Sequence, residues 1–137
     1  MRAVAHKTGT VTSLACCVAV SSGNIKVGIA SIAAEVLTIT QLASQACPAG
    51  GAWRGLGNPS FAVTRGQIVY FVLEADNTTA TFNADALGVV GMHSLVDMVG
   101  LLSYGYNNPG SFTIPATLAL SACTVTPFEF LFGGKIT

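Results

Sequence analysis

This sequence has few charged residues and no net charge. Only 9% of its 137 residues are charged, whereas about 25% is usual in globular chains. The six basic and six acidic side chains cancel. The chain thus lacks the basic excess that binds nucleic-acid phosphates, and we expect no nucleic-acid partner. A surface poor in charge and near neutrality tends to associate, so the composition favours a protein whose surface contacts neighbouring subunits.

Long hydrophobic runs are also absent. The three longest uncharged stretches, residues 8–25, 36–53 and 98–128, are each interrupted by Thr, Ser, Gly, Asn or Pro. None supplies the about 20 consecutive apolar residues that a membrane helix needs, so we expect no membrane partner. Thr12 and Ser13 interrupt the apolar part of the first 20 residues. We therefore predict no signal peptide and synthesis in a cytoplasm.

Catalytic motifs are a third absence. Histidine occurs only as His6 and His93, and the position of His93 beside Ser94 does not establish the geometry of a nucleophile and its base. The glycines form neither of the arrays that bind phosphate groups. We therefore predict that the protein is not an enzyme and holds no cofactor.

Metal-binding patterns are missing as well. The four cysteines, which lack the paired spacing of a zinc site, are Cys16, Cys17, Cys47 and Cys123. We interpret them as small buried hydrophobic residues, and a disulfide between Cys47 and one of the adjacent pair remains an alternative. The carboxylates of Glu74, Asp76 and Asp85 are of the type that binds calcium, but without the spacing of a calcium loop they are more typical of solvated turns.

The most informative stretch is residues 66–77, GQIVYFVLEADN. It contains six consecutive apolar residues, 68–73, and ends in polar turn residues, which is typical of a strand. Because side chains alternate along a strand, both faces of this one are apolar and need cover. We predict that it is the central strand. We also predict that part of the side formed by Val69, Phe71 and Leu73, or a helix covering it, lies near a subunit interface.

Short strands separated by turn signals account for most of the chain. Apart from residues 66–77, we expect strands over residues 10–20, 25–29, 35–41, 60–64, 78–83, 111–114, 117–123 and 124–132. The first two are expected to pair as a hairpin, and residues 78–83 to pair back onto the central strand. This spacing predicts an all-β fold, an antiparallel β-sandwich that is jelly-roll-like, formed as one domain by residues 10–137.

Two segments are expected to differ from this pattern. Residues 1–9 have no strand pattern of their own and are predicted to form an extended N-terminal arm. Residues 93–105 are the one credible short helix, because Ser94 and Asp97 resemble a capping box and apolar residues follow at helical spacing. Gly133 and Gly134 are expected to end the structured part of the chain.

Aromatic residues occur in two segments that read as loops. Trp53 and Arg54 lie within the long connection of residues 42–59, and Tyr104 and Tyr106 lie among glycine, asparagine and proline. Such side chains can cap the core, anchor a protein interface or stack on a sugar. All three interpretations remain open.

In overall character the chain resembles the decoration (cement) proteins of tailed-phage capsids: short strands, few charges, an N-terminal arm, loop glycines and no catalytic set. The resemblance implies a homotrimer made in the host cytoplasm and bound to the outer capsid surface of the virion. There it would clamp neighbouring capsid proteins, and Arg2 and Lys7 would contact acidic groups on a neighbour. The interface candidates are Arg2, Lys7, Trp53, Arg54, Val69, Phe71, Leu73, Tyr104 and Tyr106.

A carbohydrate- or receptor-binding module, such as a spike tip or a lectin-like sandwich, is the alternative. It would use Trp53, Tyr104 and Tyr106 together with Asn107 and Asn108, because aromatic faces and amides are the groups that bind sugars.

Overall fold

The computed structural model describes residues 2–82, 84–86, 98–105, 112–126, 128–130 and 132–137. Within them the first eight strands are β1 (Arg2–Ala5), β2 (Gly9–Val20), β3 (Asn24–Ala33), β4 (Val36–Gln41), β5 (Gln45–Ala46), β6 (Ala52–Gly57), β7 (Phe61–Val63) and β8 (Ile68–Ala75). They are followed by β9 (Thr81–Phe82), β10 (Ala84–Ala86), β11 (Met98–Gly105), β12 (Thr117–Ala119), the 3₁₀ helix η1 (Leu120–Ala122), β13 (Thr124–Thr126), β14 (Phe128–Phe130) and β15 (Phe132–Ile136). No helix among these residues is long and apolar enough to cross a membrane.

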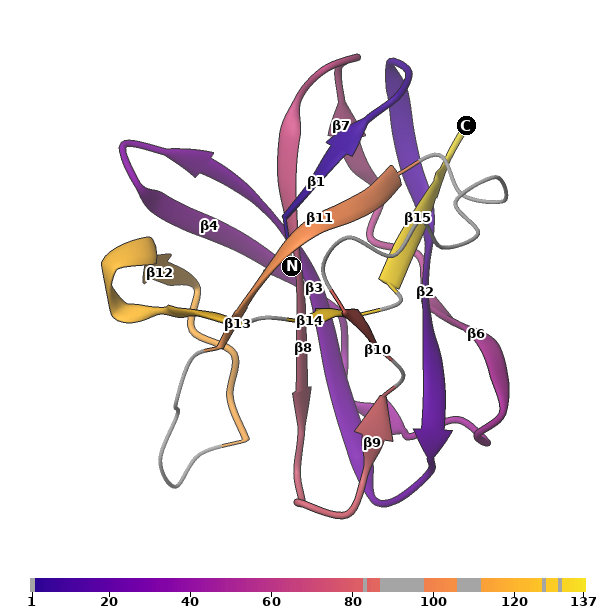
Figure 1. Cartoon of the computed structure of the whole chain (residues 1–137). Helices are drawn as coiled ribbons and strands as arrows, with labels where there is room; N and C mark the ends of the chain where they lie inside the picture. Colours follow the sequence, from indigo (N-terminus) through magenta and orange to yellow (C-terminus); the bar gives the residue numbers. More distant parts are fainter. Residues whose placement is uncertain (1, 83, 87–97, 106–111, 127, 131) are drawn as a thin grey trace.

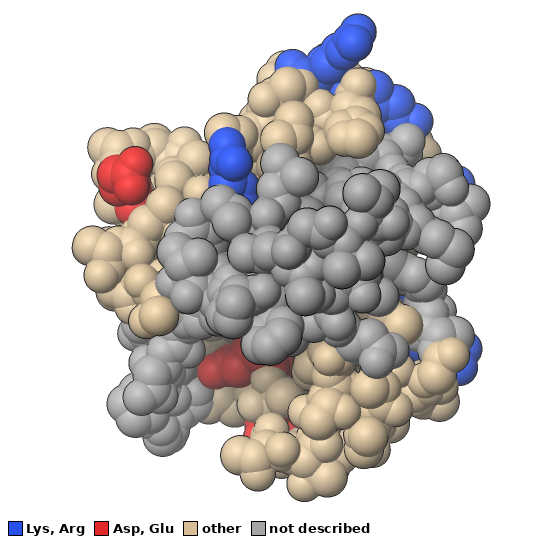
Figure 2. Space-filling view, in the orientation of Figure 1, with Lys and Arg blue, Asp and Glu red and all other residues tan. Residues whose placement is uncertain are grey.

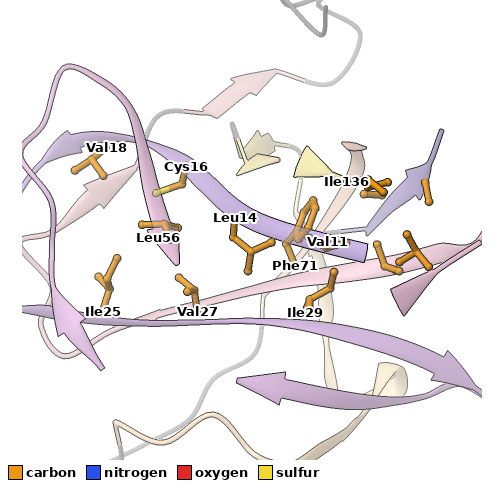
Figure 3. Close-up of a cluster of buried hydrophobic side chains, with 14 of the residues drawn as sticks. Val11, Leu14, Cys16, Val18, Ile25, Val27, Ile29, Leu56, Phe71 and Ile136 are labelled. Atoms are coloured by element: carbon orange, nitrogen blue, oxygen red, sulfur yellow. The ribbon is translucent and has the colours of Figure 1, made fainter. Parts of the chain in front are cut away.

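The fold is an all-β, antiparallel sandwich, as the sequence predicts. Its main sheet has the strand order β12-β4-β3-β8-β1-β11-β15-β2-β6, with β5, β7, β9 and β13 paired at its sides, and β10 and β14 form a separate pair. The sheet curls so that β2 lies opposite β3 and β8 (Figures 1 and 3). The core fills the space between these layers (Figure 3), and its largest buried side chains include Val11, Leu14, Cys16, Val18, Ile25, Val27, Ile29, Leu56 and Ile136.

The strand β8 is central, because β3 pairs with one of its edges and β1 with the other. Val69 and Phe71 point into the core and are 0% and 2% exposed, while Leu73 is half-buried against the same core. Tyr70 belongs to a second apolar cluster on the opposite face. Val69, Tyr70 and Phe71 are thus buried within their own subunit, on both faces of the strand. The prediction that part of the side formed by Val69, Phe71 and Leu73 lies near a subunit interface stays a prediction, and half-buried Leu73 is the part of that side that is still accessible.

The expected hairpin between the first two strands is also wrong. The strand β2 pairs with β6, β7, β9 and β15, whereas β3 pairs with β4, β5 and β8. Each has a continuous apolar face, and in a sandwich such faces pack against each other across the core. The turn at residues 21–23 therefore carries the chain from one layer to the other. Similarly, β9 pairs with β2 rather than with β8.

The predicted N-terminal arm is a strand inside the sheet. Arg2–Ala5 forms β1, which lies between β8 and β11, and Ala3 and Ala5 are 0% and 1% exposed. Alanine has too small a side chain to give a clear alternating hydrophobic pattern, but it fits where the neighbouring strands already fill the core. The first residues therefore belong to the folded domain.

The predicted helix is wrong over the part that is described. Met98–Gly105 forms β11, which pairs with β1, β13 and β15, and residues 93–97 lie outside the described residues. A short apolar run fits both helical and strand periods. Gly133 and Gly134 do not end the structure either, because they are buried in β15 and pair with β2 and β11.

Candidate functional site

A three-stranded wing projects from the sandwich, away from β2 and β6 (Figure 1). It consists of residues 31–40, which include the ends of β3 and β4, together with β12. The turn between β3 and β4 uses Ala34 and Glu35, whose φ angles are 48° and 64°. Two successive residues with positive φ are typical of the hairpin turns that match strand twist. The alternation of residues 36–41 correctly predicts the strand that follows.

One face of the wing is open. Along β4, Val36, Thr38 and Thr40 are exposed, while Leu37 and Ile39 are buried on the other side. Neighbouring strands continue the open face in register, because Thr38 pairs with Ser31 on one side and Thr117 on the other. We call this surface the hydroxyl face. Its members are Ser31, Ala33, Val36, Thr38, Thr40, Thr117 and Ala119, and none of them is charged.

The opposite face of the wing is covered by a strap, residues 112–116, which leads into β12. Ile114 is 3% exposed and packs in one cluster with Leu37, Ile39 and Tyr70. Lys26 contacts Phe112 at the start of the strap. Its ammonium group donates to the carbonyl oxygen of Phe112 at 2.7 Å and lies 4.7 Å from the centroid of the Phe112 ring. Residues 112–116 form no strand, contrary to the prediction for residues 111–114.

Backbone hydrogen bonds extend the pairing of β12 with β4 at both ends of β12. The amide of Ile39 donates to the carbonyl oxygen of Ala116 at 2.9 Å, and the amide of Leu120 donates to that of Glu35 at 2.8 Å. The end of the strap is therefore fixed beside the middle of β4, and the residue after β12 is fixed at the tip of the wing. The hairpin is thus covered on one side and hydrogen-bonded along its edge, and its other side is exposed.

The interface residues predicted from sequence that fall within the described part of the chain come from several different strands and turns. Arg2 is half-buried in β1, and Lys7 is exposed in the turn after it. Trp53 lies in β6 and Tyr104 in β11, with β15 and β2 between these strands in the sheet order. Tyr106 lies outside the described residues.

Arg54 is engaged within its own chain. Its Nε donates to the carbonyl oxygen of Ala49 at 2.8 Å, and its Nη2 lies 3.5 Å from that of Gly50. The guanidinium thus closes the loop that leads into β6. This contact gives Arg54 a structural role in the subunit.

The carboxylate of Asp76 joins two turns at one end of the sandwich. It accepts hydrogen bonds from the backbone amide and the side-chain amide of Asn24, both at 2.9 Å, and from the side chain of Asn77 at 2.6 Å. The hydrogen bond from the Asn24 backbone, followed by those from the two side chains, lowers the pKa of Asp76 below its ordinary value of 3.8. In the described part of the chain, no three His, Cys, Asp or Glu residues are grouped so as to hold a metal ion.

None of the four cysteines forms a disulfide. Cys16 and Cys47 are 1% and 7% exposed and belong to the main core, which confirms the interpretation of these two as small buried hydrophobic residues. Burial, with a smaller contribution from Cys47 and Cys17, raises the pKa of Cys16 to about 12. Its thiol therefore stays protonated and unreactive near neutral pH.

The hydroxyl face was not predicted from the sequence. The sequence shows the alternation of Thr38 and Thr40 with Leu37 and Ile39, but it does not show which side of this strand is covered. The covered side is determined by Ile114, which comes from a segment distant in the sequence. The low content of charged residues is also seen on the surface. Most of the described surface visible in Figure 2 belongs to residues that are neither basic nor acidic.

No family model, curated protein or solved structure matches this chain.

Proposed function

We propose that this protein is a non-enzymatic structural subunit of a virion, which binds the outer capsid surface as an oligomer and stabilises the shell. The main support for this proposal is the hydroxyl face. It is exposed, uncharged and held firmly on a projecting wing. A surface of this type is suited to contact with another protein, because its burial does not require the desolvation of a charge.

The proposed mechanism is stabilisation by mass action. A subunit that binds the assembled shell, and not the separated capsid proteins, shifts the equilibrium toward the shell. Repeated weak contacts suffice for this, because subunits held on one surface have a high effective concentration. The trimer implied by the resemblance to decoration proteins is part of the proposal.

The first test is the mass of the purified protein in solution. We expect sedimentation equilibrium to show a species about three times the 14.0 kDa chain at micromolar concentrations, which are typical for specific assemblies. A chain that remains monomeric at every concentration would contradict the proposed trimer.

The second test locates the protein in native particles. We expect a labelled antibody to decorate the outside of intact capsids in electron micrographs, and capsids that lack the protein to lose their contents at a lower temperature. Equal heat resistance with and without the protein would exclude stabilisation of the shell. Binding to a glycan array that is lost in Trp53→Ala would instead support the carbohydrate-binding alternative.

A further inference from the structure

We propose that residues 112–120 open from the sandwich as one unit while the rest of the sheet stays folded, and that Lys26 is the latch that keeps this unit closed. We call these residues, which comprise the strap, β12 and Leu120, the cover segment. The segment covers one side of the wing and supplies its outer edge strand. Its opening is a property of the single subunit and is independent of the proposed function.

The cover segment packs on an apolar cluster that is separate from the main core. Ile114 is its one buried side chain, and Leu118 and Leu120 are half-buried against the same cluster. The main core lies between β2 and the layer of β3 and β8 (Figure 3), and among the described residues no side chain of the cover segment belongs to it. Release of the segment therefore leaves the main core packed.

Few backbone contacts join the cover segment to the sheet. Among the described strands β12 pairs with β4 alone, because it is the last strand in the sheet order. The amides of Ile39 and Leu120 add one hydrogen bond at each end of this pairing. When β12 leaves, all six residues of β4 keep their pairing with β3. A segment with one paired edge and few buried side chains has the features of a unit that opens locally.

Lys26 fixes the end of the cover segment that lies before Ile114. Its ammonium group donates to the carbonyl oxygen of Phe112 at 2.7 Å and lies 4.7 Å from the centroid of the Phe112 ring. A hydrogen bond from a charged donor is stronger than one between neutral groups, and the ring adds a cation–π attraction. Because Lys26 belongs to β3, these contacts tie the segment to the middle of the sheet and not to the wing.

Glu74 lowers the cost of releasing this latch. It is the residue of β8 directly opposite Lys26, and the Cβ atoms of such cross-strand pairs are about 5 Å apart on the same face. The ammonium group therefore keeps an acidic neighbour after it leaves Phe112. Opening then exposes the apolar side of the wing and leaves the outer edge of β4 unpaired, while the charge of Lys26 stays compensated.

Native-state hydrogen exchange, followed by NMR at a series of urea concentrations, measures this opening. The amides of Ile39 and Leu120 report on the cover segment, because their hydrogen bonds join it to the wing. The amides of β8 that pair with β3 report on global unfolding. We expect the first group to exchange through a more populated opening that hardly depends on low urea, because it exposes little surface. The two groups should merge at higher urea, where global unfolding dominates.

Two matched isoleucine substitutions separate local opening from global unfolding. Ile114 lies in the cover segment, whereas Ile136 is 0% exposed in the main core. Ile114→Val should speed exchange in both groups of amides about two- to tenfold, because its contacts are lost in both kinds of opening. Ile136→Val should speed exchange only in β8, because the main core stays packed while the segment opens.

The latch is tested by Lys26→Met, which keeps an apolar stem and removes the ammonium group. We expect both groups of amides to exchange about tenfold faster. Lys26→Arg should restore most of the protection, because a guanidinium group also donates to a carbonyl oxygen and stacks on a ring. Lys135→Met, which removes an exposed charge from β15, should leave exchange in both groups unchanged.

Two results would overturn the inference. Exchange of Ile39 and Leu120 with the same opening free energy and urea dependence as β8 would show that the cover segment does not open by itself. Unchanged exchange of Ile39 and Leu120 in Lys26→Met, whatever happens in β8, would show that the contact with Phe112 is not lost when the segment opens and that Lys26 is not its latch.

Discussion

At the scale of single residues, Asp76 shows how one exposed carboxylate can organise two turns. Its hydrogen bonds from Asn24 and Asn77 join the turn that enters β3 to the turn that leaves β8. Asn77 extends the network by donating to the carbonyl oxygen of Ser22 at 3.1 Å. It also accepts from the amides of Thr79 and Ala80. Polar residues are concentrated in these two turns, and the hydrogen bonds between them explain this better than a metal site does.

This network predicts a pH dependence of stability. The pKa of Asp76 is lowered in the folded chain, so its contribution is present above the ordinary pKa and is lost as the pH falls through the folded value. We expect the wild type to be more stable than Asp76→Asn above about pH 5 and the difference to shrink in stronger acid. Urea denaturation at a series of pH values measures this. Glu35→Gln, which removes a carboxylate from the β3–β4 turn, should not reproduce the effect.

Gly23 is required in the same turn for two reasons. Its φ is +58°, and a Cβ atom there would overlap the carboxylate of Asp76 and the amide of Asn77. We expect Gly23→Ala to lower the free energy of unfolding by about 1–3 kcal/mol. Chemical denaturation of the purified variants is the measurement.

Two other glycines separate the cost of a positive φ from the cost of the overlap with neighbouring atoms. Gly51 has a φ of +87° but nothing within 4 Å of the position that a Cβ atom would take, and Gly55 has open space there and no positive φ. Gly51→Ala should therefore show only the backbone cost, about 1 kcal/mol. Gly55→Ala should be within about 0.5 kcal/mol of the wild type. Equal effects in all three variants would contradict this account of Gly23.

At the scale of elements, the strap makes the wing rigid. Ile114 is buried against Leu37, Ile39 and Tyr70, so Ile114→Ala should lower the free energy of unfolding by about 2–4 kcal/mol. The conservative change Ile114→Val should cost only about 1 kcal/mol. In Ile114→Ala, hydrogen exchange should become faster at the backbone amides of β4, because the strap protects the hydrogen bonds that these amides make. Unchanged exchange in β4 would show that the wing does not depend on the strap.

The existence of most strands could be predicted from the sequence, but their partners could not. Alternation in residues 10–20 and 35–41 identifies β2 and β4, because it reports how side chains face a local surface. It does not say whether β2 packs across the core from β3 or pairs beside it, since both arrangements bury the same residues. Ala3 and Ala5 are the opposite case, because small side chains leave no pattern even in a buried strand.

The candidate site was hidden for the same reason. The exposed side of β4 is defined by contacts with the strap, and the row through Thr38 is assembled from three separate segments. Residues chosen for their type, such as Arg54 and Phe71, instead proved to stabilise the subunit itself. Aromatic or charged character in a sequence does not distinguish internal contacts from external ones.

At the scale of the whole molecule, the first residues are essential to the sheet. Deletion of residues 1–5 removes β1 from between β8 and β11, which leaves two unpaired edges inside the sheet. We expect the deleted protein to lose cooperative folding, as measured by thermal melting followed by circular dichroism. Lys7→Ala, in the exposed turn that follows, should melt close to the wild type. A deletion variant that melts normally would show that these residues form a dispensable arm.

The position of β1 also bears on when the chain can fold during synthesis. Among the described strands β1 is made before its partners β8 and β11, and β2 is made long before its partner β15. The nascent chain therefore carries unpaired, apolar strands for most of its translation. Its long uncharged stretches are then exposed to other nascent chains, so molecular chaperones are expected to bind it before the sheet closes.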